Sequence, residues 1–386
     1  MVQIMGDYGF IKCDEVQDQD LYFKVSWFRG EPPHAGDVVS FEVKNFGGNL
    51  QAHYPRRADD ESVGRDGNWP IRSDHLLDWA YLGYLPNVLS ELKALARDER
   101  WEFKNAPRDP NRPFPILLSY LLHTFQRLVL EGKKVAVSES AGMAAFNTGL
   151  VDPRYEPIYA LFARSEPREG DPRKAPWELD GFCIAGEGAE GQKLVRYFNP
   201  LPVQAHYFDQ PAHLLYDTRS GKPELDWEHI VIERIDRYPK VFLEDNWPPN
   251  FEAKDVSQLD YASRKQYFAQ LGRAIKDDNR TYRRIMNRVK DAVDLCIKRV
   301  SWNFKTAVPQ YYPREESLQL LLPLCLVSDE QVDLALTVER TESGNYLGHT
   351  VLPLDWAYKN ARLICRPDSD WLEPKEILEE SSEEES

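Results

Sequence analysis

The sequence contains few cysteines, and none of them stands in a disulfide-type or zinc-type pattern. Its 386 residues include only five cysteines, and no two of these form a CxxC pair. Small disulfide frameworks and zinc modules depend on closely spaced cysteines, so neither is the basis of this fold. We therefore expect reduced thiols in a cytoplasmic protein.

Long apolar runs, a secretion signal and familiar catalytic motifs are also missing. No apolar stretch approaches the roughly 18 residues that a membrane span requires, and Met1–Asp7 lacks the charged and apolar regions of a secretion signal. Ser138–Gly142 does not match the GxSxG nucleophile elbow, and the spacing of His206 and His213 fits no familiar metal site. We expect no membrane association, no cofactor and no metal. Because no catalytic residue can be assigned, the sequence favours a binding protein over an enzyme.

The composition is that of a globular protein with an acidic balance. Hydrophobic residues make up 42% and aromatic residues 12% of a chain that is long enough for two or three domains. The formal net charge is −15 at pH 7. This charge excludes a protein that is basic over its whole surface, but it permits one local cationic face.

Gly186–Gly191 contains the letters GxGxxG, which occur in dinucleotide-binding folds. That use requires a strand before the glycines and a helix after them. Leu194–Phe198 has the short apolar and aromatic composition of a strand, and Glu187 and Glu190 would repel a pyrophosphate. We therefore predict a hairpin turn here and no dinucleotide.

The first fifty-odd residues contain four short motifs in a fixed order. They are YGFI at 8–11, DLYFKVS at 20–26, GDVVSFEV at 36–43 and NLQA at 49–52. Together they resemble the cold-shock domain, a small OB-fold barrel that binds single-stranded RNA or DNA. The resemblance implies this fold and this class of ligand for residues 1–57. The sequence departs from the family at Lys24, where the family has histidine.

The strand pattern of these motifs predicts an aromatic surface. Alternation places Tyr8 and Phe10 on one face of a strand, and Tyr22 and Lys24 on one face of the next. Nucleic-acid bases stack on such rings at roughly 1–3 kcal/mol each. Residues 1–57 hold six Lys or Arg against eight Asp or Glu, so phosphate binding has to draw on cations elsewhere. The alternative is that the rings form the barrel core.

A second resemblance covers most of the chain, from about residue 77 to residue 372. The segments that carry it are AFNTGL at 145–150, RVSWNFKTAVPQYYP at 299–313, LLLPL at 320–324, DLAL at 333–336, TVLPLDWAYKNARLI at 350–364 and PDSDWL at 367–372. They are similar to domain-of-unknown-function family 3825 (DUF3825). The resemblance implies no established reaction and no catalytic residue. It implies an RNA context, since such domains tend to occur beside small RNA-binding modules.

The longest helical pattern, from Asp255 to about Val300, is strongly basic. Twelve Lys or Arg against four Asp lie between residues 261 and 305, a local charge of +8 in an acidic chain. Arg280, Arg284 and Arg288 recur every four residues and so share one helix face. We predict that these arginines and Lys305 bind phosphates. The alternative is an ordinary solvated helix face.

Aromatic and amide side chains follow directly after this helix. Such side chains stack on bases or hydrogen-bond their edges, and the group comprises Trp302, Asn303, Lys305, Gln310, Tyr311 and Tyr312. A buried aromatic turn between Pro309 and Pro313 explains the same residues equally well. Both interpretations stay open at this point.

These patterns predict an α+β protein. It consists of a small N-terminal β-barrel of the cold-shock-like OB-fold type, followed by a larger mixed α/β domain with a long basic helix. We place the barrel at residues 1–57, a polar linker at 58–72, the large domain at 73–372, and a disordered acidic tail with seven glutamates at 373–386.

We therefore expect a cytoplasmic protein that binds single-stranded RNA or DNA, in a regulatory or stress-related role. One alternative is an RNA- or nucleotide-processing enzyme whose pocket in the large domain is walled by Asn147, Thr148, Asn303, Lys305, Asp355 and Asn360. Another is a protein-interaction scaffold whose acidic tail recruits a basic partner. The sequence does not determine the oligomeric state.

Overall fold

The computed structural model describes residues 2–5, 8–12, 20–24, 39–46, 49–57, 75–103, 113–165, 175–249, 251–256, 259–369 and 371–372. The chain divides into two compact units. One contains Met1–Asp74 with Val137–Met143, and the other contains His75–Ala136 with Ala144–Ser386. The predicted linker at 58–72 and the predicted acidic tail at 373–386 lie outside the described residues.

The N-terminal part of the chain forms one five-stranded sheet, sheet A, with the strand order β1-β2-β3-β5-β4. Its strands are β1 (Val2–Met5), β2 (Tyr8–Ile11), β3 (Leu21–Lys24), β4 (Val39–Phe46) and β5 (Asn49–Arg57). All neighbours are antiparallel except β3 and β5, which run parallel. Among the described residues β1 does not pair with β4, so the structure has a five-stranded sheet here and its closure into a barrel stays a prediction.

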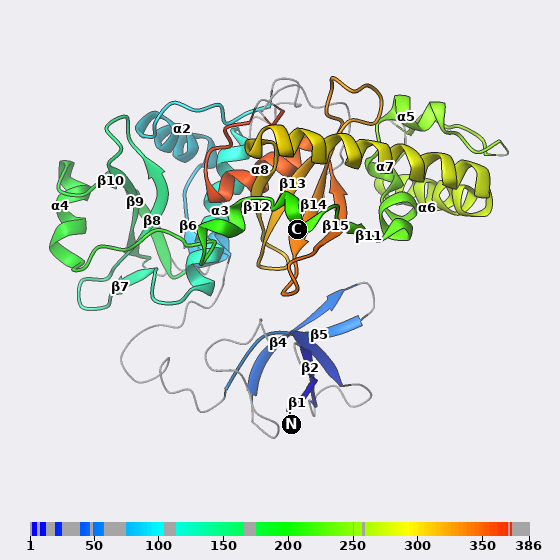
Figure 1. The fold of residues 1–386 in the computed structure, drawn as a ribbon. Coiled ribbons are helices and arrows are strands. Elements are labelled where there is room, and N and C mark those ends of the chain that lie inside the picture. The colour runs from blue at the N-terminus through cyan, green and yellow to red at the C-terminus, as the bar shows by residue number, and fades with distance from the viewer. Residues whose placement is uncertain are drawn as a thin grey trace. The chain divides into compact units, whose positions relative to one another are not determined.

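The large domain contains two further five-stranded sheets (Figure 1). Sheet B has the order β6-β10-β9-β8-β7, with β6 (Ala80–Tyr81), β7 (Ala136–Ser138), β8 (Met143–Val151), β9 (Pro157–Arg164) and β10 (Trp177–Ile184). Sheet C has the order β11-β15-β14-β13-β12, with β11 (Glu224–Leu225), β12 (Val308–Tyr312), β13 (Ser317–Leu324), β14 (Leu334–Arg340) and β15 (Tyr346–Leu352). The coarse prediction of a mixed α+β protein is therefore confirmed.

Helices surround these two sheets. They are α1 (Leu76–Trp79), α2 (Leu85–Leu95), α3 (Pro115–Leu130), α4 (Gly188–Tyr197), α5 (Lys240–Asp245), α6 (Tyr261–Asp277), α7 (Asn279–Trp302) and α8 (Leu354–Ile364). A π-helical turn covers His229–Glu233, and 3-10 turns cover Pro211–Leu214, Thr218–Ser220, Ile235–Arg237 and Phe304–Thr306.

The interruption between α6 and α7 has a local cause. The carboxylate of Asp278 accepts hydrogen bonds from the backbone N–H of Arg280 at 3.2 Å and from the Thr281 hydroxyl at 2.6 Å. An aspartate that caps a new helix in this way holds its own backbone outside helical geometry. The single long basic pattern therefore folds as two helices.

The prediction of a strand at Leu194–Phe198 is wrong, because most of this segment belongs to α4. Gly191 and Leu194 are buried three residues apart, whereas Lys193 and Arg196 are solvent-facing or half-buried, which is helical periodicity. Gly191 also lies so close to β10 that a Cβ would overlap the Ile184 carbonyl oxygen. A five-residue apolar run is too short to separate a strand from one turn of a packed helix.

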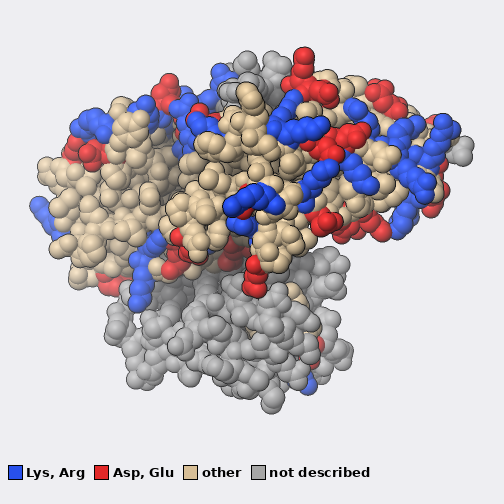
Figure 2. All heavy atoms as spheres, viewed as in Figure 1, with Lys and Arg blue, Asp and Glu red and all other residues tan. Residues whose placement is uncertain are grey.

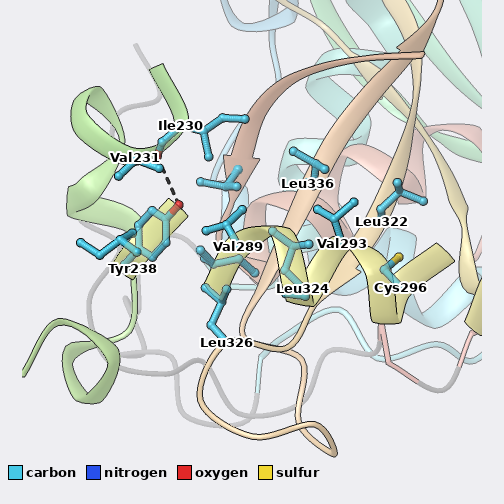
Figure 3. Packing of buried hydrophobic residues seen from close by; sticks show 14 of the residues in the cluster. Ile230, Val231, Tyr238, Val289, Val293, Cys296, Leu322, Leu324, Leu326 and Leu336 are labelled. Carbon is cyan, nitrogen blue, oxygen red and sulfur yellow. Dashed lines mark hydrogen bonds between the residues drawn. The ribbon is translucent and has the colours of Figure 1, made fainter. Parts of the chain in front are cut away.

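Sheet C has its apolar core on the face that α7 covers (Figure 3). The stripe of α7 that meets the sheet includes Ile285, Val289, Val293, Cys296 and Val300, all at most 4% exposed. It packs with the alternate residues of two strands, Leu320, Leu322 and Leu324 of β13 and Leu334, Leu336 and Val338 of β14. Each fully buried aliphatic side chain contributes about 1.5–3 kcal/mol. This burial fixes which side of α7 faces solvent.

A buried ion pair ties α8 to the segment before α3. The Arg362 guanidinium donates to both carboxylate oxygens of Glu99 at 2.6 and 3.0 Å. It also lies over the rings of Trp101 and Tyr120, at 5.0 and 4.6 Å from their centroids. Both charged side chains are at most 10% exposed. Since α3 and α8 are in contact, the pair fastens three segments of the large domain together.

Candidate functional site

An aromatic pair lies on sheet A where the sequence predicted a stacking surface. Phe10 of β2 and Tyr22 of β3 are register partners, and their ring centroids are 6.1 Å apart in an edge-to-face arrangement. Both residues are half-buried. Their neighbours Ile11, Leu21 and Phe23 are at most 1% exposed, so the core lies on the opposite face.

Tyr8 and Lys24, the other two predicted binding residues of this sheet, are also register partners at the end of β2 and β3. Their backbone positions are described, but their side chains lie outside the described parts of the structure. The backbone register therefore places Tyr8 and Lys24 next to the pair formed by Phe10 and Tyr22, two residues along each strand.

The three predicted phosphate-binding arginines of α7 are all exposed, but they have different partners. Arg284 Nε donates to Asn246 Oδ1 at 3.0 Å, and Arg288 Nη2 donates to the Leu326 carbonyl oxygen at 2.5 Å. The side chain of Arg280 has no such partner among the described residues. Arg284 and Arg288 therefore brace α7 against its neighbours, whereas Arg280 is available to a ligand.

Acidic side chains are interspersed with the cations of α6 and α7 (Figure 2). Lys276 forms an ion pair with Glu228, and Asp294 forms one with Lys222 at 2.5 Å. Lys290 lies over the ring of Trp227 at 5.2 Å. Several of the twelve cations counted in the sequence are thus already engaged within the fold, so the cationic surface is smaller than the local charge of +8 indicates.

Exposed aromatic rings mark the C-terminal end of α7. Trp302 is 92% exposed and Phe304 is 59% exposed, while Tyr311 and Gln310 of the next strand are at most 2% exposed. The aromatic segment recognised in the sequence therefore divides into an exposed half and a buried half. An almost fully exposed tryptophan lacks the stabilisation that burial would provide. Exposed aromatic side chains of this kind are typical of contact surfaces.

Lys305 is engaged with the C-terminal segment of the domain. Its ammonium forms an ion pair with Asp368 at 2.6 Å, and this hydrogen bond lowers the pKa of the Asp368 carboxyl. Trp371 Nε1 donates to the Thr306 carbonyl oxygen at 2.8 Å and holds the same two segments together. Lys305 would have to exchange a carboxylate for a phosphate in order to bind nucleic acid.

The residues suggested as a pocket wall for an enzyme are largely committed to the fold. Asn147 Oδ1 accepts from the Gly149 N–H at 2.9 Å, and the Thr148 hydroxyl donates to the Ile158 carbonyl oxygen at 2.7 Å. Asn303 ends α7 and accepts from the backbone N–H of Lys305. These contacts satisfy backbone groups, which is a structural role.

The glycine motif does stand between a strand and a helix, contrary to the predicted hairpin. Gly186 and Gly188 have φ angles of +82° and +63°, which only glycine adopts without strain. However, the next strand along the chain, β11, belongs to sheet C, so the βαβ unit of a dinucleotide fold does not form around them. Glu187 and Glu190 also place negative charge at the start of α4.

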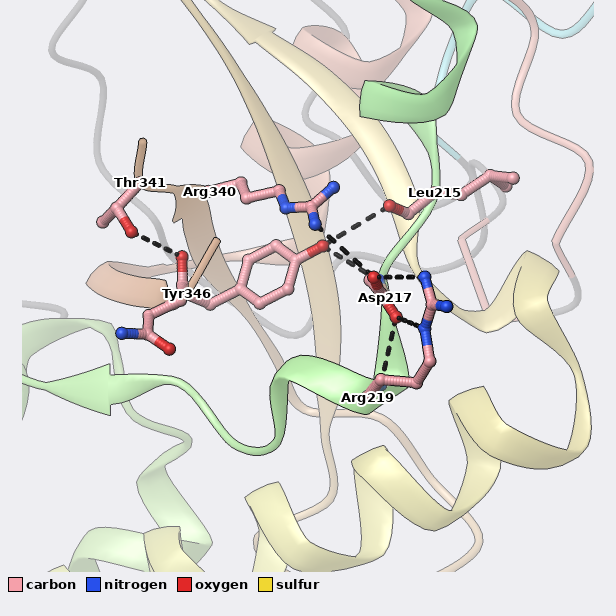
Figure 4. Close-up of polar contacts among 7 residues, drawn as sticks. Leu215, Asp217, Arg219, Arg340, Thr341 and Tyr346 are labelled. Atoms are coloured by element: carbon pink, nitrogen blue, oxygen red, sulfur yellow. Dashed lines mark hydrogen bonds and ion pairs between the residues drawn. The ribbon is translucent and has the colours of Figure 1, made fainter. Parts of the chain in front are cut away.

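A charged cluster beside sheet C is a structural brace (Figure 4). Asp217 accepts two hydrogen bonds from the Arg219 guanidinium, each at 2.9 Å, and one from Arg340 at 3.4 Å. The bonds from Arg219 lower the pKa of Asp217 to about 2. The backbone N–H of Asp217 donates to the Tyr346 hydroxyl at 2.9 Å. Both carboxylate oxygens of Asp217 therefore accept hydrogen bonds from within the fold.

The described residues offer neither a metal centre nor a membrane-spanning helix. No group of three or more His, Cys, Asp or Glu in these ranges is arranged to hold a metal ion. None of the helices in the same ranges is both long and apolar enough to cross a bilayer.

Comparison with known proteins identifies the large domain. A family model described as "Domain of unknown function (DUF3825)" matches residues 92–371. This match covers most of the chain, and the protein therefore belongs to that family. It confirms the second resemblance seen in the sequence and does not extend to sheet A. No curated protein and no solved structure gives a significant match.

Two features with functional potential were missed by sequence reasoning. Phe304 was not singled out, although its place two residues after Trp302 in an Asn- and Lys-containing segment was a usable signal. Arg237 was not singled out either. It lies in a short charged turn, and its partners Thr350 and Val351 are more than a hundred residues away in the chain. No local pattern indicates such a contact.

The different partners of the α7 arginines predict different effects on stability. Arg284→Gln and Arg288→Gln should each lower the free energy of unfolding by about 1 kcal/mol, because each loses a hydrogen bond to a neighbouring segment. Arg280→Gln is the matched control and should stay within about 0.5 kcal/mol of the parent protein. Urea denaturation of the three variants measures this. Equal stabilities would mean that the bracing contacts contribute nothing and that all three arginines are equivalent surface charges.

Proposed function

We propose that this protein binds single-stranded nucleic acid, with α7 and sheet A each contributing contacts. The observation that carries the proposal is that α7 combines exposed cations, which have no side-chain partner among the described residues, with exposed aromatic rings at its C-terminal end. Single-strand binding proteins use this combination, with the cations following the phosphates and the rings stacking on the bases.

Four side chains define the proposed contact surface of α7. Arg280, Arg283, Lys298 and Trp302 are all exposed, and the three cations have no side-chain partner among the described residues. At 3.6 residues per turn, the four fall within roughly 100° of each other around the helix, and Arg280 and Lys298 are about 27 Å apart along it. Asp291 lies between them on the same side, so we assign separate contacts to the two ends of the helix.

Sheet A supports the same function as a cold-shock-like OB-fold module. Its parallel β3–β5 pair is not part of a simple meander, and pairing of β1 with β4 would close the sheet into a five-stranded barrel. In OB-folds the face formed by strands 2 and 3 binds oligonucleotides. Phe10 and Tyr22 occupy that position in sheet A.

The aromatic pair of sheet A should contribute to binding by stacking. Phe10→Ala and Tyr22→Ala should each weaken the affinity for a labelled single-stranded RNA by roughly 1–3 kcal/mol. Tyr22→Phe is the matched control, because it keeps the ring and should bind nearly as well as the parent protein. Fluorescence anisotropy measures the affinities, and circular dichroism verifies the fold. Unchanged affinity of a folded Phe10→Ala protein would assign the ring to the core of the module.

The tryptophan at the end of α7 should contribute independently of sheet A. Trp302→Ala should weaken single-strand binding by roughly 1–3 kcal/mol, whereas Trp302→Phe should retain most of the affinity because every base can stack on a phenyl ring. Since Trp302 is almost fully exposed, neither change should alter the urea midpoint. The same titration with duplex RNA provides the comparison, because paired bases are not accessible for stacking. An equal loss on duplex and single strand would contradict a stacking role.

The exposed cations at the start of α7 should act through phosphates. The double variant Arg280→Gln/Arg283→Gln removes up to two contacts, so the slope of log affinity against log salt should become shallower by about 1.4, at ~0.7 per single-strand contact. Affinity should fall equally for all sequences, because phosphates carry no base information.

A matched control for this experiment removes the same charge elsewhere. Arg196→Gln/Lys240→Gln changes two exposed cations on α4 and α5 and should leave the slope unaltered. If the α7 double variant and this control have the same slope as the parent protein, α7 does not contact the phosphates. The protein-interaction scaffold would then be the better description of this surface.

A further inference from the structure

One face of sheet C carries polar side chains although it is buried. The register pairs Gln310 with Gln319 and Thr337 with Thr350, and Leu321, two residues after Gln319, pairs with Thr337. Antiparallel partners point to the same face, so all five residues share it. It is the face on the α8 side, since the alternate residues of β13 and β14 pack against α7. Gln310, Gln319 and Thr337 are each at most 3% exposed.

An amide network connects this face to α8. Asn360 Nδ2 donates to Gln310 Oε1 at 3.3 Å, and Gln310 Nε2 donates to Gln319 Oε1 at 3.0 Å. Gln319 Nε2 in turn donates to the Ser317 hydroxyl at 3.0 Å. Apolar residues would cover a purely structural sheet face at lower cost, because buried amides must keep every hydrogen bond satisfied. The network is satisfied within the fold and makes this buried face polar.

Arg237 lies at the β15 edge of the same face and is held there rigidly. Its Nη1 donates to the Thr350 hydroxyl at 3.1 Å and to the Val351 carbonyl oxygen at 2.7 Å. Its guanidinium stacks on the ring of Trp356, in the first turn of α8, at 5.1 Å from the ring centroid. Two hydrogen bonds from one nitrogen and a stacking contact leave the planar group no freedom to rotate.

The other edge of the guanidinium, formed by Nε and Nη2, has no acceptor among the described residues. An arginine presents five N–H donors, and the contacts to Thr350 and Val351 use only those of Nη1. Arg237 as a whole is half-buried. The Nε and Nη2 edge is one of the two forks with which arginine binds carboxylate and phosphate groups in bidentate geometry.

The charge of Arg237 has no ion-pair partner among the residues that the structure describes. Burial, together with the positive charges of Arg234 and Arg314, lowers its pKa to about 10, against the opposing effects of Asp236 and Tyr312. No carboxylate oxygen among the described residues accepts a hydrogen bond from Arg237. A half-buried guanidinium in this environment lacks a counter-ion, and a bound anion with two charges would supply one.

We propose that Arg237, at the edge of the polar face of sheet C, forms a binding site for a phosphate group. The Nε and Nη2 edge of Arg237 binds two phosphate oxygens, while Thr350 and Trp356 hold the guanidinium in place. A phosphate suits the site because Arg234 and Arg314 add positive potential at Arg237, against the opposing effects of Asp236 and Tyr312. This site is separate from the surface proposed on α7 and does not depend on it.

The first test is calorimetric titration of the full-length protein with AMP, inorganic phosphate and adenosine. AMP and phosphate should bind and adenosine should not, because the phosphate makes the decisive contact. Tighter binding of AMP than of phosphate would identify a nucleotide as the source, and equal binding would identify the free anion. Failure of both AMP and phosphate to bind at millimolar concentration would overturn the proposal.

The matched variants are Arg237→Lys and Arg196→Gln. Arg237→Lys keeps the charge but loses the fork, and it should weaken AMP binding about 10- to 100-fold, the loss typical of a hydrogen bond to a charged group. Arg196→Gln, which changes an exposed arginine of α4 outside both proposed sites, is the control and should bind AMP like the parent protein. If Arg237→Lys binds AMP as tightly as the parent, the assignment to Arg237 is wrong. Single-strand binding should be affected by Arg280→Gln on α7 and by neither of these variants, which separates the two sites.

A measurement on the protein without substitutions tests the proposed phosphate site even if Arg237→Lys fails to fold. Phenylglyoxal adds to the neutral form of a guanidine, so the lowered pKa of Arg237 should make it react readily, and peptide mass mapping reports the site. AMP should protect Arg237 several-fold and leave the labelling of Arg196 unchanged, whereas adenosine should protect neither. Labelling of Arg237 at the same rate with and without AMP would overturn the proposal.

Discussion

Burial of sheet C on both faces determines where the functional groups of the large domain can stand. The strands β13 and β14 present leucines to α7 on one side and a mixed polar and apolar surface to α8 on the other. Once the apolar stripe of α7 is committed to the first face, its cations and the following Trp302 must point to solvent. Once α8 lies on the second face, its polar groups are buried, and Arg237 meets this part of the sheet at β15.

Much of the large domain could be predicted from the sequence because its signals are local. The apolar period of α6 and α7, the break at Asp278 and the bounds of β10 follow from side chains that are close in the chain. The strands β8 and β12 were not predicted, since neither has an isolated alternating pattern with turn residues on both sides. The segment Leu194–Phe198 was assigned to the wrong element because packing against β10, not composition, makes it a helix.

The sequence could predict candidate site residues only where their side chains are simply exposed and no contact with a distant segment decides their role. The charge and aromatic content of residues 280–305 indicated a binding surface, and several of these side chains are exposed. Which arginines are already engaged could not be predicted, because Asn246 and Leu326 are each 38 residues away from the arginine they bind. The environment of Arg237 depends on β15, α8 and the end of β12, which only the tertiary fold brings together.

The buried pair formed by Glu99 and Arg362 restricts how this domain can diverge. Breaking such a pair by changing one partner costs about 3–5 kcal/mol, which is a large part of the 5–15 kcal/mol that stabilises a typical domain. Replacing both partners with well-packed apolar residues is often neutral. A path that changes one partner at a time therefore passes through a strongly destabilised intermediate. We expect the two positions, 263 residues apart, to tolerate a paired replacement better than either single change.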